Sequence, residues 1–329
     1  MPLNHQLHLN LGRFGKVGRQ ALMGNSESQP TLLKVIINII AGSKDTHFDR
    51  LRKLPCTVAS LEPLNGGCIS NAFLLTLKDG KQVFVKSCIH DMALYKAERN
   101  GLEAIRATQT LRVPEVLGLG KTDCGSSFLV LEAVESGHAT ATSEIELGRC
   151  LAKMHRKTQV TRFGYPQSNF IGSTIQVNNW TDDWTSFFIE HRLTPQIKLA
   201  QNHGLTTPTF NRSADHLLSK LGKLLTNSFS PVLIHGDLWA GNVIIAKEGT
   251  PVLIDPAVSY SDREFEFGMT SLFGEFGSHF YEAYNEFWPL NDGWQERVKI
   301  YQLYHLLNHL NLFGSSYFEA CMTTLKRFS

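Results

Sequence analysis

The sequence predicts an α+β fold with two lobes, an antiparallel β-sheet lobe followed by a mainly helical lobe. The 329 residues are enough for two domains of about 150 residues, or for one domain built as two lobes. Strand-like periodicity is concentrated before residue 133, and helical spacing dominates after it. We therefore expect a flexible extension over residues 1–30, an amino-terminal lobe over residues 31–133 and a helical lobe over residues 134–329.

Composition excludes several classes of protein. The 32 basic and 30 acidic residues leave a net charge of +2, which is no footprint for nucleic acid or an anionic membrane. The most apolar stretch, residues 32–41, contains Lys34 and Asn38 and is shorter than the roughly 18 residues that a membrane span needs. The six cysteines form no CxxC pair and are too few for a disulfide scaffold. We expect a globular, cytoplasmic protein, and enzyme is the default class for this size.

Residues 1–30 differ from the rest of the chain. They hold four glycines and the basic residues Arg13, Lys16 and Arg19, and no acidic residue precedes Glu27. A flexible tail is the first interpretation. A transit-like targeting segment is the alternative, because such segments are rich in arginine and poor in acid.

The elements of the amino-terminal lobe follow in order. Residues 31–54 have helical spacing broken near Gly42, and residues 56–64, 71–78 and 81–88 have strand spacing. Asp79-Gly80 between the last two strands is a strong hairpin signal. A helix over residues 91–108 and strands over residues 114–119 and 127–133 complete the lobe.

The carboxy-terminal lobe is predicted to be helical with one β island. Ser143 to Glu146 has the S-x-x-E spacing of a capping box, which would open a helix that ends near residue 157. Helical spacing returns over residues 181–203, 212–226 and 294–313, and Gly314 ends the last of these. Three short apolar strands, residues 231–235, 242–246 and 251–255, interrupt the helices, with a turn at Gly249.

The β island carries the strongest chemical signal. In HGDLWAGN, Asp237 and Asn242 lie five residues apart in a loop between two strands, and Asp255 ends the next strand. A hairpin brings these oxygen-bearing side chains to one edge, with one carboxylate free to accept a proton. The remaining amide and carboxylate suit Mg²⁺, which takes few protein oxygens and completes its shell with phosphate and water. This spacing is the phosphoryl-transfer pattern of kinases.

A kinase also needs a strand lysine and a helix carboxylate in its amino-terminal lobe. Lys86 lies in the third strand and faces away from Val85. Glu98 falls on the apolar stripe of the next helix, four residues from both Leu94 and Leu102. A carboxylate on a buried face is costly unless it is paired, so we expect Lys86 and Glu98 to pair and hold the α- and β-phosphates of ATP.

Two further segments are expected to bind the nucleotide. Between the first two strands, Gly66 and Gly67 free the backbone to approach phosphates, and the neighbouring Cys68, Ser70 and Asn71 complete the loop. The linker after the fifth strand would run behind adenine. There we expect an edge-strand backbone from Glu132 to Val134 to hydrogen-bond the base, which an ordinary buried strand would not exclude.

Together these residues resemble the aminoglycoside phosphotransferase and choline kinase branch of the protein-kinase-like fold. Further segments narrow the resemblance to the fructosamine (ketosamine) kinase family: NGGCIS, FLVLE, FGYPQSNFIG, NNWTDDWTSFFIEHRLTPQ, LIHGDLWAGNV, LIDPAVSYSDREFEF and LYHLLNHLNLFG. The likeness covers about residues 45–320, and the blocks at 163–197 and 251–276 are its most specific parts.

The resemblance implies ATP-dependent phosphorylation of the third-carbon hydroxyl of ketosamines, on small molecules or glycated proteins, followed by loss of the labile product and deglycation. It implies Asp237 as the catalytic base and Asn242 and Asp255 as magnesium ligands. Glu266 stands where the family usually has aspartate, and that acid resembles the one that braces the catalytic loop.

Several side chains have two interpretations. Cys68 is either a small filler or a redox-sensitive thiol on the phosphate loop. His305 and His309 are spaced as a metal pair, but helix packing is favoured, and His235 is expected to brace the catalytic loop. Trp180 and Trp184, four residues apart in a helical stretch, either pack in the core or stack on the sugar.

Two other functions stay open at this stage. One is a small-molecule kinase of the aminoglycoside or choline type, against which the block at 163–197 argues. The other is a catalytically inactive nucleotide-binding regulator, against which the complete set of phosphoryl-transfer residues argues.

Overall fold

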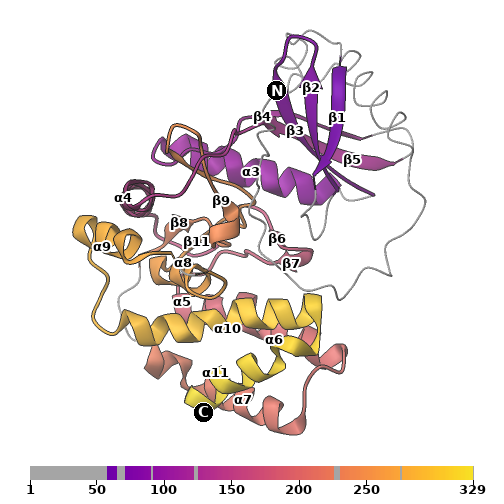
Figure 1. Ribbon diagram of the computed structural model, residues 1–329. Coiled ribbons are helices and arrows are strands. Elements are labelled where there is room, and N and C mark those ends of the chain that lie inside the picture. Colours follow the sequence, from indigo (N-terminus) through magenta and orange to yellow (C-terminus); the bar gives the residue numbers. More distant parts are fainter. Residues whose placement is uncertain are drawn as a thin grey trace.

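The structure of the chain is a computed structural model that describes residues 58–64, 71–89, 92–121, 125–225, 230–274 and 276–328. Its first part is a five-stranded antiparallel sheet with one helix packed against it (Figure 1). The bounds are β1 (Val58–Leu64), β2 (Asn71–Leu77), β3 (Gln82–Ile89), α3 (Met92–Thr108), β4 (Val116–Lys121) and β5 (Ser126–Glu132). The expected strands and the helix at 91–108 are confirmed, whereas the helix expected over 31–54 lies outside the described residues.

Alternation along the strands decides which face of this sheet is covered. In β5, Leu129 and Leu131 point to the face that α3 covers, and Phe128 and Val130 point to a small core on the opposite face. Gly80 has a φ of +83° in the β2–β3 turn, so the predicted Asp79-Gly80 hairpin is confirmed. The strand order β1-β2-β3-β5-β4 places β5 between β3 and β4.

The second part is mainly helical. Its helices are α4 (Ala141–Lys157), α5 (Trp184–Phe188), α6 (Thr194–Asn202), α7 (Pro208–Leu224), α8 (Arg263–Thr270), α9 (Ser278–Phe287), α10 (Trp294–Phe313) and α11 (Phe318–Phe328). A π-helical segment (Ile189–Leu193) joins α5 to α6, and short 3-10 turns lie at Ala240–Asn242 and Ser315–Tyr317. The short strands are β6 (Asn169–Ile171), β7 (Thr174–Gln176), β8 (Val232–Ile234), β9 (Val243–Ile245), β10 (Pro251–Leu253) and β11 (Ser259–Ser261).

The start of α4 corrects one prediction. The helix is capped by Thr140, whose side chain accepts from the Ser143 backbone N–H at 3.2 Å. The Ser143 hydroxyl in turn accepts from the Thr140 backbone N–H at 2.9 Å, so the capping box is Thr140–Ser143 and not Ser143–Glu146. A serine at the third helical position can fill the role that a glutamate usually has, because its oxygen reaches the same N–H.

The β content of this part also exceeds the prediction of one island. β6 and β7 form a second hairpin, and β8 pairs with β11, while β9 pairs with β10. Strands of three residues are too short to display an alternating pattern, so neither β6–β7 nor β11 gave a sequence signal. Trp180 precedes the helical stretch, because α5 begins only at Trp184 after the N-cap Asp183.

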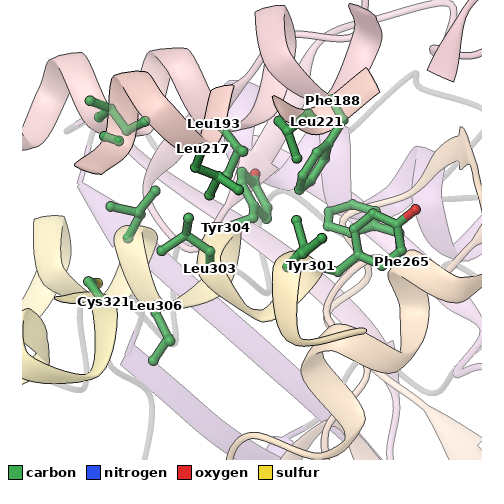
Figure 2. Packing of buried hydrophobic residues seen from close by; sticks show 14 of the residues in the cluster. Phe188, Leu193, Leu217, Leu221, Phe265, Tyr301, Leu303, Tyr304, Leu306 and Cys321 are labelled. Atoms are coloured by element: carbon green, nitrogen blue, oxygen red, sulfur yellow. The ribbon is translucent and has the colours of Figure 1, made fainter. Parts of the chain in front are cut away.

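Helix α10 is the centre of the larger core, and Figure 2 shows its side chains together with Leu217 and Leu221 of α7 and Cys321 of α11. Tyr301, Leu303, Tyr304 and Leu307 are all at most 2% exposed, so the helix is covered on nearly every side. Gly314, with a φ of +89°, ends it as predicted. This central helix supports α8 and the strands that carry the candidate site.

Among the described residues, no helix has both the length and the apolar character needed to cross a lipid bilayer.

Candidate active site

The HGDLWAGN loop connects β8 to β9 and is closed tightly against the segment after β10. Gly236 has a φ of +82°, and a Cβ at this position would lie 2.2 Å from the Ala257 carbonyl oxygen. The Ala257 N–H donates to the His235 carbonyl at 2.8 Å. Only glycine satisfies both the left-handed conformation and this close approach, so residue 236 sets how near the two segments lie.

Two buried side chains brace this loop from below. The Glu266 carboxylate accepts from the His235 and Gly236 backbone N–H groups, at 2.5 and 2.9 Å. The His235 ring bonds the Ile254 carbonyl through Nε2 at 2.9 Å, and its Nδ1 accepts from the Asp237 N–H at 3.3 Å. Burial lowers the pKa of His235, in keeping with a neutral ring. Both His235 and Glu266 therefore brace the loop. The glutamate side chain, one methylene longer than the aspartate usual in the family, reaches two backbone N–H groups.

Asp237 is held in place by Asn242. The Asn242 amide Nδ2 donates to the Asp237 backbone carbonyl at 2.8 Å and to its carboxylate Oδ2 at 3.1 Å. Burial, and next the negative charge of Asp255, raise the pKa of Asp237 to about 7. A carboxylate oriented in this way and titrating near neutrality has the properties of a general base.

Asp255 follows β10 in an unusual backbone conformation. Its φ is +57°, in the left-handed region that costs a non-glycine residue of the order of 1–3 kcal/mol and is often found at functional sites. The Ile254 N–H donates to the Asn242 carbonyl at 3.0 Å, which fixes Asp255 beside the catalytic loop. The side chain of Asp255 is 43% exposed and can therefore reach a ligand.

The predicted pair between Lys86 and Glu98 is present, with Nζ 2.8 Å from Oε1. The same ammonium contacts the carboxylate of Asp255, so one lysine joins β3, α3 and the β10 loop. Burial disfavours the charged lysine, but the two carboxylates outweigh it and raise the pKa of Lys86 above its usual range. Partial burial opposes ionisation of Asp255, and the Lys86 charge nevertheless lowers its pKa.

The donors near Asp255 fit a magnesium ion. Both hydrogen bonds of the Asn242 amide use Nδ2, which leaves its oxygen to join the Asp255 carboxylate as a hard ligand. In the part of the chain that the structure describes, no group of three or more His, Cys, Asp or Glu side chains is placed to hold a metal ion. Mg²⁺ bound with a nucleotide takes one or two protein ligands and fills its shell with phosphate and water.

The nucleotide-loop residues predicted from sequence fall largely outside the described residues. This holds for Gly66, Gly67, Cys68 and Ser70, and therefore also for both interpretations of the Cys68 thiol. Asn71 is described: it is the exposed first residue of β2 and pairs with Ser87 of β3. Its neighbour Ala72 pairs with Lys86, so Asn71 lies one residue along β2 from the position opposite Lys86.

The linker prediction needs a correction. β5 is an interior strand, and the Glu132 N–H donates to the Glu115 carbonyl at 2.8 Å, so this N–H is not an edge-strand donor. The Glu132 carboxylate accepts from Arg112 at 2.8 Å and from the Glu115 N–H at 3.1 Å. Val134, half-buried, lies beyond the strand end, so a base-binding role there stays a prediction.

Burial decides the interpretation of Trp184 and His305, whereas the stacking of Trp180 on a sugar stays a prediction. Trp184 is 1% exposed and stacks on Phe187 and Phe188 in the core, whereas Trp180 is 37% exposed and stacks on Tyr260. Packing is therefore confirmed for Trp184. His305 is buried and stacked on Phe265, as expected for helix packing.

Two residues of the site region were missed by the sequence reading. Arg112 contacts the carboxylates of both Glu132 and Glu248, and so ties the end of β5 to the β9–β10 turn. His155 lies under the loop brace, with Nε2 3.6 Å from the Glu266 carboxylate. Its position four residues after Leu151 on an apolar stripe was an available signal for a buried polar group.

The family model of fructosamine kinase matches residues 42–328. The chain belongs to the fructosamine kinase family. It is 40% identical over 276 residues to a probable ketoamine kinase of Synechocystis, covering 83% of this chain and 91% of that protein. It is 37% identical to a chloroplastic protein-ribulosamine 3-kinase of Arabidopsis thaliana, covering 82% of each.

Solved structures place this fructosamine kinase family member in the protein-kinase-like α+β fold. A crystal structure from Haemophilus somnus, provisionally named fructosamine-3-kinase, matches with a TM-score of 0.79 and 26% identity, covering 90% of this chain and 97% of that one. Choline kinase LicA from Streptococcus pneumoniae matches with a TM-score of 0.58 at 16% identity, covering 91% and 100%. The latter likeness concerns the fold alone.

Proposed function

We propose that this protein is an ATP-dependent ketosamine kinase that phosphorylates the third-carbon hydroxyl of sugar adducts on amines. One observation carries the proposal: in a chain of the fructosamine kinase family, contacts bring together five side chains of the phosphoryl-transfer type. They are Lys86, Glu98, Asp237, Asn242 and Asp255. Relatives named ketoamine kinase and protein-ribulosamine 3-kinase support the ketosamine as the acceptor.

In this mechanism, Asp237 accepts the proton of the attacking sugar hydroxyl. Its pKa of about 7 leaves the carboxylate about half ionised at neutral pH and mostly ionised above it, and Asn242 orients it through a hydrogen bond to Oδ2. Lys86, fixed by Glu98, presents a positive charge toward the nucleotide phosphates. A magnesium ion held by Asn242 and Asp255 would neutralise charge on the transferring phosphoryl group.

The product would be a labile phosphorylated ketosamine that breaks down and frees the amine. Glycated proteins or their small ketosamine fragments are therefore the proposed substrates, and deglycation is the proposed outcome. We expect the nucleotide to bind between the β1–β5 sheet lobe and the helical part. The boundary between the two lobes near residue 133 is therefore also proposed.

The compartment also stays a proposal. The cysteine usage favours the cytoplasm, while the Arabidopsis relative carries the name chloroplastic. Imaging of the full chain with a carboxy-terminal fluorescent tag would separate a cytoplasmic from an organellar site.

The deciding experiment is an ATP-consumption assay over ribulosyl-lysine, fructosyl-lysine, choline and kanamycin, with mass spectrometry of the products. We expect a gain of one phosphate on a ketosamine, and an Asp237→Asn variant as the inactive control. Turnover only on choline or kanamycin would instead support a small-molecule kinase of the fold neighbours' type. Nucleotide binding without turnover of any acceptor would support an inactive regulator.

A further inference from the structure

Arg192 is a buried cation that has no acidic partner in the described part of the chain. It lies in the π-helical segment between α5 and α6 and is 0% exposed. Among the described residues no carboxylate forms an ion pair with it, and burial lowers the pKa of its guanidinium to about 10. Burying a charge is costly unless it is paired or hydrogen-bonded, so the polar contacts of Arg192 have to offset its desolvation. Single π-helical turns are also frequent near functional sites.

The contacts of Arg192 lead to the end of the β6–β7 hairpin. Its Nη1 donates to the Val177 carbonyl at 2.7 Å, and its Nη2 donates to the side-chain oxygen of Asn178 at 2.7 Å. The guanidinium also lies over the Phe187 ring, 4.5 Å from the centroid. The planar guanidinium thus makes two hydrogen bonds and one ring contact at the same time. A lysine ammonium would not reproduce this combination.

From Asn178 the hydrogen bonds continue through two more buried amides. The Asn178 amide donates to the Asn169 side-chain oxygen at 2.9 Å, and the Gln176 amide donates to the same oxygen at 2.8 Å. The Tyr304 hydroxyl of α10 donates to the Gln176 oxygen at 2.7 Å. Asn169, Gln176 and Asn178 are each at most 5% exposed, so solvent does not compete for these groups.

The network ends on the backbone that follows Asp255. The Asn169 amide donates to the Val258 carbonyl at 2.7 Å, and the Gln176 amide donates to the Ala257 carbonyl at 3.1 Å. On its other side, Ala257 is bonded to His235 and packed against Gly236 of the catalytic loop. The segment 257–258 is therefore held from both sides, two residues beyond the left-handed Asp255.

We propose that Arg192, Asn178, Asn169, Gln176 and Tyr304 form a positioning network that holds Asp255 in the geometry needed for the metal–nucleotide complex. These are positioning residues, since each acts through the backbone at 257–258 and not on the reacting atoms. The inference rests on the proposed function for the identity of the metal and nucleotide. The proposed role of the 163–197 block is thus to position Asp255, which is a role other than contact with the sugar.

The test compares nucleotide binding with and without the metal in the full chain. Tyr304→Phe removes a single hydroxyl, and Arg192→Lys keeps the charge but loses the planar fork. Matched controls are Tyr281→Phe, whose hydroxyl contacts Thr270, and Arg162→Lys, an exposed arginine directly before the block that is paired with Asp182. The dissociation constant of ADP is measured by calorimetry in saturating Mg²⁺ and again in EDTA, with the melting temperature of each protein.

We expect the dissociation constant of Mg·ADP to rise about tenfold in Arg192→Lys and by a smaller factor in Tyr304→Phe, the usual scale for residues that orient a metal ligand. The constant measured in EDTA should stay within about twofold of the wild type, and both controls should match the wild type in both conditions.

Equal changes with and without Mg²⁺, or a lower melting temperature with no change in either constant, would overturn the positioning role. If Arg192→Lys does not fold, Tyr304→Phe decides between these outcomes. Because no ketosamine is present, failure of the proposed acceptor would appear only as absent turnover in the wild type and would not affect this result.

Discussion

Replacing Asp237 by asparagine should stabilise the fold at alkaline pH while abolishing turnover. Burial and the charge of Asp255 raise the pKa of Asp237 to about 7, whereas a solvated aspartate titrates near about 3.9. The folded protein therefore holds this proton more tightly than the unfolded chain does. Below about pH 4 both states are protonated, and ionisation of Asp237 costs no stability.

As the pH rises from about 4 to about 7, the unfolded chain releases the proton first, so this contribution to stability falls and is fully lost above pH 7. A pKa change of this size corresponds to about 4 kcal/mol at most. Since the side chain is partly exposed and water screens its charge, we expect about half of that, roughly 2 kcal/mol. The uncharged asparagine avoids this cost and is able to keep the Asn242 contact through its carbonyl oxygen.

The assay is urea unfolding of wild type and Asp237→Asn without nucleotide or metal, at about pH 5 and about pH 8. The free energy of unfolding of the variant should rise relative to that of the wild type as the pH rises. At about pH 8 the variant should be more stable by roughly 2 kcal/mol. Asp215→Asn, on the exposed side of α7, is the control for loss of a surface carboxylate. Turnover by Asp237→Asn should fall by about 10²–10⁴. A stability difference that does not change with pH, or a variant less stable than wild type at about pH 8, would refute the assigned environment of Asp237.

Four further substitutions test the rest of the site. Asp255→Ala should abolish magnesium-dependent activity and Asn242→Ala should weaken it, and unchanged magnesium titration curves in both variants would contradict their role as ligands. Glu266→Asp should lose one of two backbone contacts, at about 1–3 kcal/mol, seen as a lower melting temperature and a lower kcat; equal values to wild type would show that the extra methylene is not needed. Gly236→Ala places a Cβ 2.2 Å from a carbonyl oxygen at a positive φ, so it should leave little folded, active enzyme, whereas Gly222→Ala, in open space on α7, should have no such effect in circular dichroism and activity.

The chemistry-bearing residues were accessible from the sequence because their signals are local. The spacing of Asp237, Asn242 and Asp255 lies within one hairpin, so hydrogen bonds over a few residues fix their relation. Lys86 and Glu98 are twelve residues apart on adjacent elements, and the cost of burying a lone carboxylate was enough to predict their pairing. Nucleotide-loop residues such as Cys68 and the role of Val134 stay predictions.

The tertiary structure decided two kinds of feature: contacts between segments distant in the sequence, and elements too short to show a hydrophobic period. The β6–β7 hairpin and the pairing of β8 with β11 rest on strands of three residues, which carry no readable alternation. The interior position of β5 corrected the linker prediction, because strand order depends on partners far along the chain.

Arg192 illustrates the same limit at the level of one side chain. The sequence shows only an arginine in a helical stretch, which by itself favours a solvated position. Its route through Asn178 and Asn169 to the backbone beyond Asp255 depends on a contact between Asn169 and Val258, which are 89 residues apart. The sequence by itself thus predicted which groups come together in the proposed site, since their spacing is set by local backbone geometry. Only the tertiary structure decided what holds them at their working positions, because that depends on buried polar groups satisfying one another across the fold.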